Sequence, residues 1–293
     1  MTSQQADGLL IIDKPAGWTS HDVVAKLRRI TGTKRVGHAG TLDPLATGVL
    51  VVGVGKATRL LGHLALGEKE YLATIRLGQA TDTCDAEGTV IAGAPAGEVT
   101  RAAAEAAARA LTGEIQQVPP AISAIKVDGA RAHRLARAGT PPVLAARPVT
   151  VSSFRIDAER RAGDLLDVDV AVTCSSGTYI RALARDMGEA LGVGGHVTVL
   201  RRTRAGPYDL SLARGLDGLD PGEALIPLAR AAADAFPSRL LTDGEARWLS
   251  HGGRLPGTGG PPGPVAAFGP DGTLIALVEE SGDKTKPLAV FVP

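Results

Sequence analysis

The first half of the chain alternates apolar runs with amphipathic segments. Residues 8–13, GLLIID, and residues 49–54, VLVVGV, are apolar runs of the length of a strand. The second run shows no polar alternation, which is typical of a strand covered on both faces. A third strand is predicted at residues 71–78, YLATIRLG.

Helical spacing appears between these strands. Ser20 can cap a helix that Gly32 ends, and a shorter helix is predicted at residues 57–65. An alanine-rich helix is predicted at residues 99–111 because alanine has the highest helix propensity. The apolar face of the first helix consists of Val23, Val24, Leu27 and Ile30.

The second half continues with strands and helices. Residues 166–172 alternate apolar and polar positions as a half-buried strand does, residues 175–177 predict a turn, and a helix follows up to Leu191. A further strand is predicted at residues 196–206 and a helix at residues 224–235.

The tail has a different character, and a domain boundary is predicted at Pro237. Residues 263–282, GPVAAFGPDGTLIALVEESG, predict a hairpin whose turn is Pro-Asp-Gly. Residues 286–292, KPLAVFV, predict a closing strand. We therefore expect a large domain in residues 1–236 and a small β-rich domain in residues 237–293.

The amino-acid composition indicates the class of protein. Hydrophobic residues make up 44% and charged residues 22%, as in an ordinary globular protein. The first residues lack the basic and apolar regions of an export signal, and the longest apolar run is too short to cross a bilayer. Cys84 and Cys174 match no metal or redox spacing. We expect a soluble, cytoplasmic protein.

The net charge is only +1, but basic residues gather in two segments. Residues 121–147 hold five Lys or Arg and one acid, and residues 201–204 are RRTR. Basic patches of this kind suit a phosphate backbone. A solvated helix face explains them equally well.

One carboxylate stands alone in residues 37–53, GHAGTLDPLATGVLVVG. A phosphate-binding loop is excluded because Ala57 follows the Gly-Lys pair and Leu50 stands where the motif needs glycine. A metal site would need more ligands than His38 and Asp43, and no GxSxG motif is present. Asp43 is therefore either a carboxylate that acts alone or a structural turn residue.

Two features favour a functional Asp43. Pro44 biases the Asp43 backbone towards an extended conformation, and the buried strand behind it can hold the carboxylate in place. Two of the three tyrosines, Tyr71 and Tyr179, lie in charged or turn-forming segments. A ring there suits stacking on a nucleic-acid base, although a core tyrosine would explain each one singly.

Taken together, seven segments resemble the successive motifs of bacterial tRNA pseudouridine-55 synthases, the TruB type. The segments are LLIIDKPAGW, TSHDVV, GHAGTLDPLATGVLVVGVGKATRL, KEYLATIRLGQATDTCDAEG, QVPPAISAIKVDGARAHRLARAG, CSSGTYIRALARDMG and VTVLRRTRAGPY. They cover roughly residues 8–235, and the tail resembles the family's PUA-like RNA-binding domain more loosely. The resemblance implies an α+β fold, with a mixed, mainly antiparallel sheet core of the pseudouridine synthase type, flanking helices and a small β-rich PUA-like C-terminal domain.

The resemblance also implies a reaction. Asp43 would be the nucleophile that isomerises the T-loop uridine of tRNA to pseudouridine, and Arg181 would pair with it, because a guanidinium stabilises an ionised carboxylate. Tyr71 would stack on the base and manage its C5 proton. Five further residues are implied to bind the substrate or to order the pocket: Lys14, His38, Asp85, Tyr179 and Leu200.

These five have different implied roles. His38 would enter the T loop where the uridine flips out, a step that costs a few kcal/mol. Tyr179 and Leu200 would line the pocket, Asp85 would form hydrogen bonds around the tyrosine and the arginine, and Lys14 would lie near the RNA. The resemblance implies no metal, no cofactor, no membrane contact and no obligate protein partner, in a monomer that binds the T-arm of tRNA.

Two positions depart from the family pattern. Ile122 and His133 stand where relatives carry tyrosines, so the clamp on the T-arm is expected to be less aromatic and more electrostatic. Two other functions stay open from the sequence. One is a guide-dependent pseudouridine synthase that acts on ribosomal RNA, and the other is a chaperone that binds tRNA without modifying it.

Overall fold

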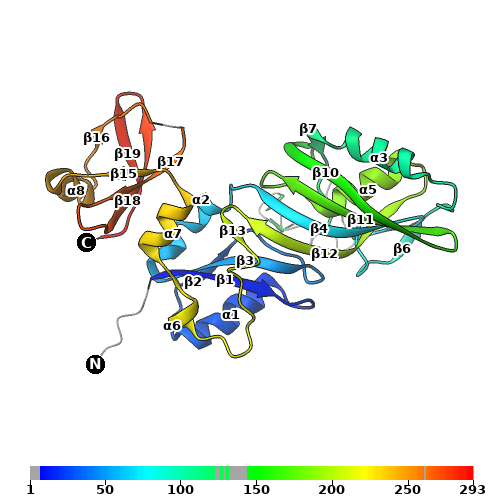
Figure 1. The fold of residues 1–293 in the computed structure, drawn as a ribbon, viewed down its shortest axis with the longest axis horizontal. Coiled ribbons are helices and arrows are strands. Elements are labelled where there is room, and N and C mark those ends of the chain that lie inside the picture. The colour runs from blue at the N-terminus through cyan, green and yellow to red at the C-terminus, as the bar shows by residue number, and fades with distance from the viewer. Residues whose placement is uncertain (1–6, 123–125, 128–129, 132–143, 261, 293) are drawn as a thin grey trace. The chain divides into compact units, whose positions relative to one another are not determined.

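Two compact units make up the chain. The computed structural model describes residues 7–122, 126–127, 130–131, 144–260 and 262–292. Contacts between Cα atoms place residues up to 43, 48–67 and 205–293 in the first unit, and residues 44–47 and 68–204 in the second. Figure 1 labels most elements of both units. The predicted domain boundary at Pro237 stays a prediction.

The first unit contains a small antiparallel sheet around a buried strand. β3 (Thr47–Val54) pairs with β1 (Gly8–Lys14) and with β2 (Val36–Ala39), and β1 also pairs with β14 (Ile226–Pro227). Every residue of β3 after Thr47 is buried. This confirms the prediction that the strand is covered on both faces.

Helix α1 (Ser20–Thr31) packs against β2 and ends at Gly32, whose φ of 66° is left-handed. Its cap is Thr19, not Ser20 as predicted: Thr19 Oγ1 accepts a hydrogen bond from Asp22 N at 3.1 Å. The hydroxyl of Ser20 accepts instead from Leu42 N at 2.9 Å and donates to Leu42 O at 3.2 Å. The helix start therefore anchors the residue that precedes Asp43.

The C-terminal part of the first unit is a five-stranded sheet. Its order is β15, β17, β18, β19, β16, with β15 parallel to β17 and the other pairs antiparallel. The predicted hairpin is confirmed as β17 and β18, and α8 (Asp243–Ser250) is an element that was not predicted. The strand bounds are Ser238–Leu240 for β15, Leu255–Pro256 for β16, Pro264–Phe268 for β17, Leu274–Ser281 for β18 and Lys284–Val290 for β19.

Short elements complete this unit. The predicted helix at residues 57–65 is a 3-10 turn followed by a single α-helical turn, and the predicted helix at residues 224–235 begins only at Leu228 because Pro227 precedes it. The elements are η1 (Gly55–Arg59), α2 (Leu61–Leu64), β13 (Tyr208–Asp209), α6 (Pro221–Ala224) and α7 (Leu228–Ala235).

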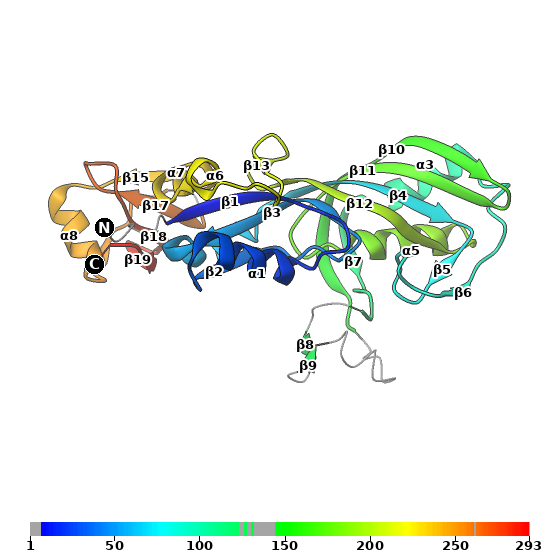
Figure 2. The same ribbon diagram turned by 90° about the horizontal axis from the view of Figure 1, so that it is seen from below.

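The second unit is built on a sheet of order β12, β4, β11, β10, β7, and the pairs from β4 to β7 are antiparallel. Helix α5 packs against β4, and α3 packs against β10 and α5 (Figure 2). Two short ladders lie apart from this sheet, β5 with β6 and β8 with β9. The bounds are β4 (Lys69–Leu77), β5 (Ala80–Thr81), β6 (Val90–Ala92), α3 (Arg101–Ala110), β7 (Gly113–Gln117), β8 (Lys126–Val127), β9 (Ala130–Arg131), β10 (Arg147–Ala162), β11 (Leu165–Cys174), α5 (Ile180–Ala190) and β12 (Gly195–Ala205).

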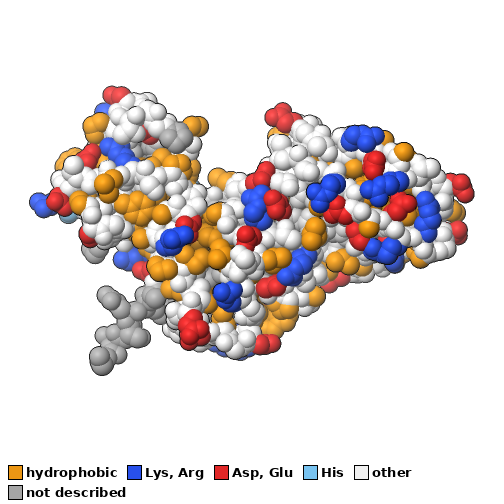
Figure 3. Space-filling model, viewed as in Figure 1, with side chains coloured by type: hydrophobic (Ala, Val, Ile, Leu, Met, Phe, Trp, Pro, Cys, Tyr) orange, Lys and Arg blue, Asp and Glu red, His pale blue; other side chains and the backbone are white. Residues whose placement is uncertain are grey.

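The two faces of this sheet differ in chemistry. On one face, alternate residues of β4 and β11 are buried and lie opposite each other, among them Tyr71 beside Val172. On the other face, acids and bases pair, as Arg76 does with Asp167 at 2.7 Å. Figure 3 shows Lys and Arg side chains interspersed with Asp and Glu side chains over the part of the molecule that contains β4, β10 and β11. Further pairs on β10 and β11 are Arg155 with Asp157 and Arg160 with Asp169. The charged face is thus balanced, and Tyr71, one of the functional candidates, lies on the buried face.

The predicted fold class is confirmed. Both units combine helices with sheets that are mainly antiparallel, and the C-terminal part is rich in strands. Within the described part of the chain, no helix has both the length and the apolar character needed to cross a membrane.

Candidate functional site

The centre of the candidate site is a buried ion pair in the second unit. Arg181 Nη1 lies 3.3 Å from Asp85 Oδ2, and both side chains are 4% exposed. The guanidinium also donates to Thr83 O at 2.7 Å and to Ile122 O at 3.0 Å. A buried guanidinium requires such partners, since losing a counter-charge in the interior is costly. Arg181 is therefore fixed in place by the loop that carries Asp85.

This loop, QATDTCDAEG, is shaped by its own hydroxyl groups. Thr83 Oγ1 donates to Asp85 Oδ1 at 2.5 Å, and Thr81 Oγ1 donates to Asp85 O at 2.7 Å. Cys84 has a φ of 59°, a left-handed conformation that costs a non-glycine residue about 1–2 kcal/mol. The strained residue lies directly before Asp85, whose carboxylate contacts Arg181.

Tyr179 is positioned through its backbone. It is the N-cap residue of α5, and its side chain caps nothing. The buried side chain of Gln117, at the end of β7, accepts from Tyr179 N at 2.8 Å and donates to Tyr179 O at 3.1 Å. One amide therefore ties β7 to the start of the helix that carries Arg181. The sequence analysis missed Gln117, because a single glutamine in a strand carries no signal of this role.

Tyr71 and Leu200 are both buried, on β4 and β12, which are neighbours in the sheet. Tyr71 shares its face of β4 with Lys69, whose side chain is also buried. Burial, together with the nearby charge of Arg202, lowers the pKa of Lys69 to about 8. Two buried basic residues thus accompany the predicted base-stacking tyrosine.

The basic segment at residues 201–204 is not the exposed patch that the sequence suggested. Arg202 is 1% exposed, and Arg204 donates to Glu68 at 2.8 Å and to Glu70 at 2.7 Å. Arg201 donates to Thr47 Oγ1 at 3.2 Å. Arg202 is therefore buried while Arg201 and Arg204 are partly exposed, so the interpretation of this segment as an exposed patch is wrong for Arg202.

The other basic segment falls mostly outside the described residues. His133 lies there, as do Arg134 and Arg137. Ile122 is described, and its backbone oxygen accepts from Arg181. The expected electrostatic clamp on the T-arm therefore stays a prediction.

Three predicted site residues belong to the first unit. Asp43 is partly buried in the loop that follows Leu42, and His38 on β2 packs edge-on against His21 with ring centroids 5.4 Å apart. Lys14 is fully buried, and its Nζ donates to Trp18 O at 2.6 Å. The contacts of Lys14 show a role in holding the loop before α1, and its proximity to RNA stays a prediction.

The predicted residues thus fall into two sets. In the second unit, the structure brings Asp85 and Arg181 into contact, and it buries Tyr71 and Leu200 in adjacent strands. The pairing of Asp43 with Arg181 stays a prediction.

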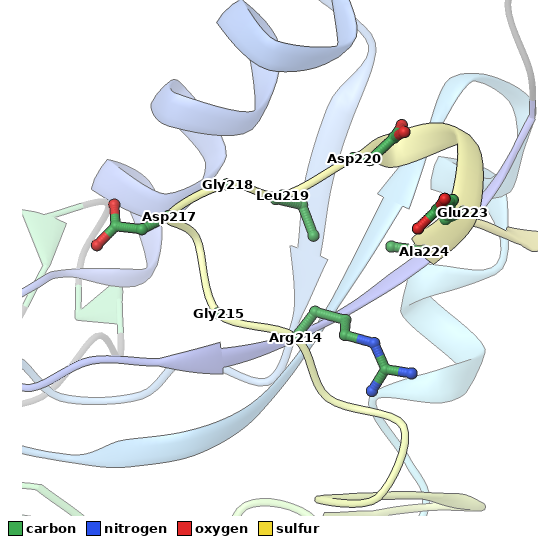
Figure 4. Close-up of a pocket in the computed structure, with 8 residues that line it drawn as sticks. All are labelled: Arg214, Gly215, Asp217, Gly218, Leu219, Asp220, Glu223 and Ala224. Carbon is green, nitrogen blue, oxygen red and sulfur yellow. The ribbon is translucent and has the colours of Figure 1, made fainter.

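A pocket of about 400 Å³ in the first unit contains none of these residues. Figure 4 shows its lining, in which the carboxylates of Asp217, Asp220 and Glu223 lie apart from one another. Asp220 already accepts from Gly222 N at 2.7 Å as the cap of α6. Excess acidic charge disfavours a phosphate ligand here. Among the residues that the structure describes, no group of His, Cys, Asp and Glu could hold a metal ion.

Known proteins match the chain over its whole length. Residues 28–180 match the family described as "TruB family pseudouridylate synthase (N terminal domain)", and residues 236–292 match "tRNA Pseudouridine synthase II, C terminal". Residues 181–221 match "tRNA pseudouridylate synthase B C-terminal domain".

Individual relatives agree with the family matches. The tRNA pseudouridine synthase B of Thermobifida fusca is 59% identical, covering 98% of this chain and 99% of the relative. That of Streptomyces griseus is 57% identical, covering 99% and 100%. A solved structure titled "Crystal Structure of a Cbf5-Nop10-Gar1 Complex" contains a chain with a TM-score of 0.73 and 30% identity, covering 98% of this chain and 84% of that one. The chain belongs to the TruB family of pseudouridylate synthases.

Proposed function

We propose that this protein is an isomerase that converts the T-loop uridine of tRNA, at position 55, to pseudouridine. The observation that carries the proposal is 59% identity, over nearly the whole chain, to a tRNA pseudouridine synthase B. The buried pair of Arg181 and Asp85 beside the sheet that bears Tyr71 supports it.

In the proposed reaction, the ionised carboxylate of Asp43 attacks the flipped uridine. The glycosidic bond between N1 and C1′ breaks, the uracil turns, and C5 bonds to C1′. The proton leaves C5 and N1 ends protonated, so no atom is gained or lost. Asp43 is released unchanged at the end, and the step calls on no oxidant or reductant.

Each further residue has a proposed role in this cycle. Arg181 stabilises the ionised carboxylate of Asp43 when the RNA is bound, and Asp85 holds the guanidinium in the orientation that this contact needs. Tyr71 stacks on the uracil and handles the C5 proton, with Tyr179 and Leu200 lining the pocket. His38 fills the space that the uridine leaves in the T loop, and Lys14 orders the loop next to the RNA.

We place the enzyme in the cytoplasm, as a monomer that recognises the T-arm without an obligate protein partner, metal or cofactor. Residues 237–293 form its PUA-like RNA-binding domain. The fold is shared with a chain of a Cbf5-Nop10-Gar1 complex, but the identity to that chain is only 30%, against 59% to the bacterial enzyme. The comparison favours the enzyme that acts on tRNA over a guide-dependent enzyme or a chaperone.

The test uses the pure chain and an unmodified T-arm hairpin, with no other protein or RNA added. Pseudouridine is mapped by mass spectrometry after carbodiimide labelling. We expect one modified position, in the loop. Modification that required a guide RNA or an accessory protein would contradict the proposal, and so would a hairpin that is bound but never modified.

A further inference from the structure

Trp248 is a large aromatic side chain that the fold leaves exposed. It lies on α8 and is 60% exposed, whereas the next residue, Leu249, is fully buried in the core of the five-stranded sheet. An indole normally lies in a core or an interface because it carries a large apolar surface. The position of Trp248 therefore suggests a ligand.

The indole is held in place although it is exposed. Its Nε1 donates to Arg254 O at 3.1 Å, and Gly253 N donates to Trp248 O at 3.0 Å. A Cβ atom at Gly253 would stand 2.2 Å from Nε1, so the ring lies directly on the glycine backbone. A ring that is fixed before binding loses little rotamer entropy when a ligand stacks on it.

The surroundings of the ring are basic. Arg247, His251 and Arg254 are all exposed, and residues 246–270 contain no Asp or Glu. The carboxylate of Glu245 is engaged, since it accepts from Thr242 N at 2.9 Å and from Arg239 at 3.2 Å. Glu280 accepts from Thr258 N at 2.6 Å. Asp243 and Glu245 lie in the first turn of α8, and Arg247 and Arg254 flank Trp248 in the sequence. A fixed aromatic ring accompanied by exposed arginines is typical of sites that bind single-stranded nucleic acid.

We infer that Trp248 is a stacking platform for an unpaired base of the RNA substrate, and that Arg247 and Arg254 contact the phosphates beside that base. The inference rests on the proposed function only in taking tRNA as the RNA. It adds a contact that is separate from the residues assigned to the reaction.

The test compares the full-length W248A and W248F variants with wild type. L240A is the matched control, because Leu240 is another exposed apolar side chain, 75% exposed, on β15 of the five-stranded sheet whose core contains Leu249 of α8. The probes are a tRNA transcript and a short oligoadenylate, at fixed salt concentration. W248A should bind both about 10-fold more weakly, W248F should lose much less, and L240A should bind as wild type does. Indole fluorescence should change on binding of the oligoadenylate in wild type, and that change should be smaller in W248F, in which Trp18 is the one remaining tryptophan.

Product formation separates this inference from the proposed function. W248A should lose product formation only in proportion to its weaker RNA binding, so that saturating protein restores conversion of the tRNA transcript in a single turnover. Wild-type affinity of W248A for either probe, or an equal loss in L240A, would overturn the inference. If W248A does not fold, the double variant R247Q/R254Q provides the test. The slope of log affinity for the oligoadenylate against log salt concentration should fall in magnitude by about 1.4, because two phosphate contacts are lost. An unchanged slope would overturn the inference.

Discussion

Gln117 offers a sharp test of how the fold positions the pocket. Its buried amide makes two hydrogen bonds to the backbone of Tyr179. In Gln117→Leu both bonds are lost, at about 1 kcal/mol each, and the partly buried N–H of Tyr179 loses this acceptor, at a further cost of up to ~1 kcal/mol. Tyr179 O keeps its helical partners, Ala182 N and Leu183 N. We therefore expect a loss of about 2–3 kcal/mol in the free energy of unfolding.

The same loss should appear in the reaction, because Tyr179 begins the helix that carries Arg181. If all of it acts on the transition state, the rate falls by roughly 30- to 150-fold. Single-turnover release of tritium from tRNA labelled at uridine C5 measures this step, since C5 must lose its hydrogen. Gln116→Leu is the matched control, because Gln116 is the exposed neighbour on the same strand.

Gln117→Glu tests the donated bond by itself. The introduced carboxylate still accepts from Tyr179 N, but it faces Tyr179 O without a proton to donate. Its protonated form restores the bond, so its pKa in the folded protein should exceed that in the unfolded chain. The stability of this variant should then be highest at low pH and fall as pH rises through the folded-state value. Equal rates and stabilities for the substitutions at 116 and 117 would refute the reasoning.

Two further predictions concern buried charge. Asp85→Asn removes the counter-charge of Arg181 and should destabilise the fold by about 3 kcal/mol, the lower end for a broken buried pair, because Thr83 O and Ile122 O still accept from the guanidinium. Urea unfolding measures the loss, and Asp167→Asn, in a more exposed pair with Arg76, should lose at most about 1 kcal/mol; similar losses would contradict the account. The pKa of Lys69 is lowered to about 8, so between pH 8 and the ordinary value near 10.4 the unfolded chain binds more protons, and this residue makes stability rise with pH. Lys69→Met should remove that rise from the stability curve, and an unchanged curve would show that Lys69 is not buried in solution.

Much of the fold could be predicted from the sequence where the signal is local. The unbroken apolar run in β3 and the Pro-Asp-Gly turn of the C-terminal hairpin specify their elements directly. The capping box Thr242 to Glu245 marks the start of α8 and could have predicted that helix. The cap of α1 was placed one residue late, because Thr19 and Ser20 both carry hydroxyls and only the contact with Leu42 separates them.

The candidate site depends on contacts between distant segments, and these are not visible in a single sequence. Asp85 and Arg181 could be matched to motifs, but the left-handed Cys84 that lies before Asp85 has no local signal. Arg202 is buried because alternate side chains of β12 point to opposite faces of the sheet. The sequence RRTR shows no alternation of apolar and polar residues that would predict this burial. Side-chain composition suggested a surface patch there, but the sheet buries Arg202 and leaves Arg201 and Arg204 partly exposed.

The central claim is that one carboxylate, that of Asp43, performs the chemistry. Asp43→Asn keeps the size of the side chain and removes its ability to form an ionised nucleophile. The most direct measurement is the amount of pseudouridine formed by this variant in a single turnover, together with its affinity for the same tRNA. The account predicts affinity close to wild type and no detectable pseudouridine. Product at a rate near wild type would contradict it.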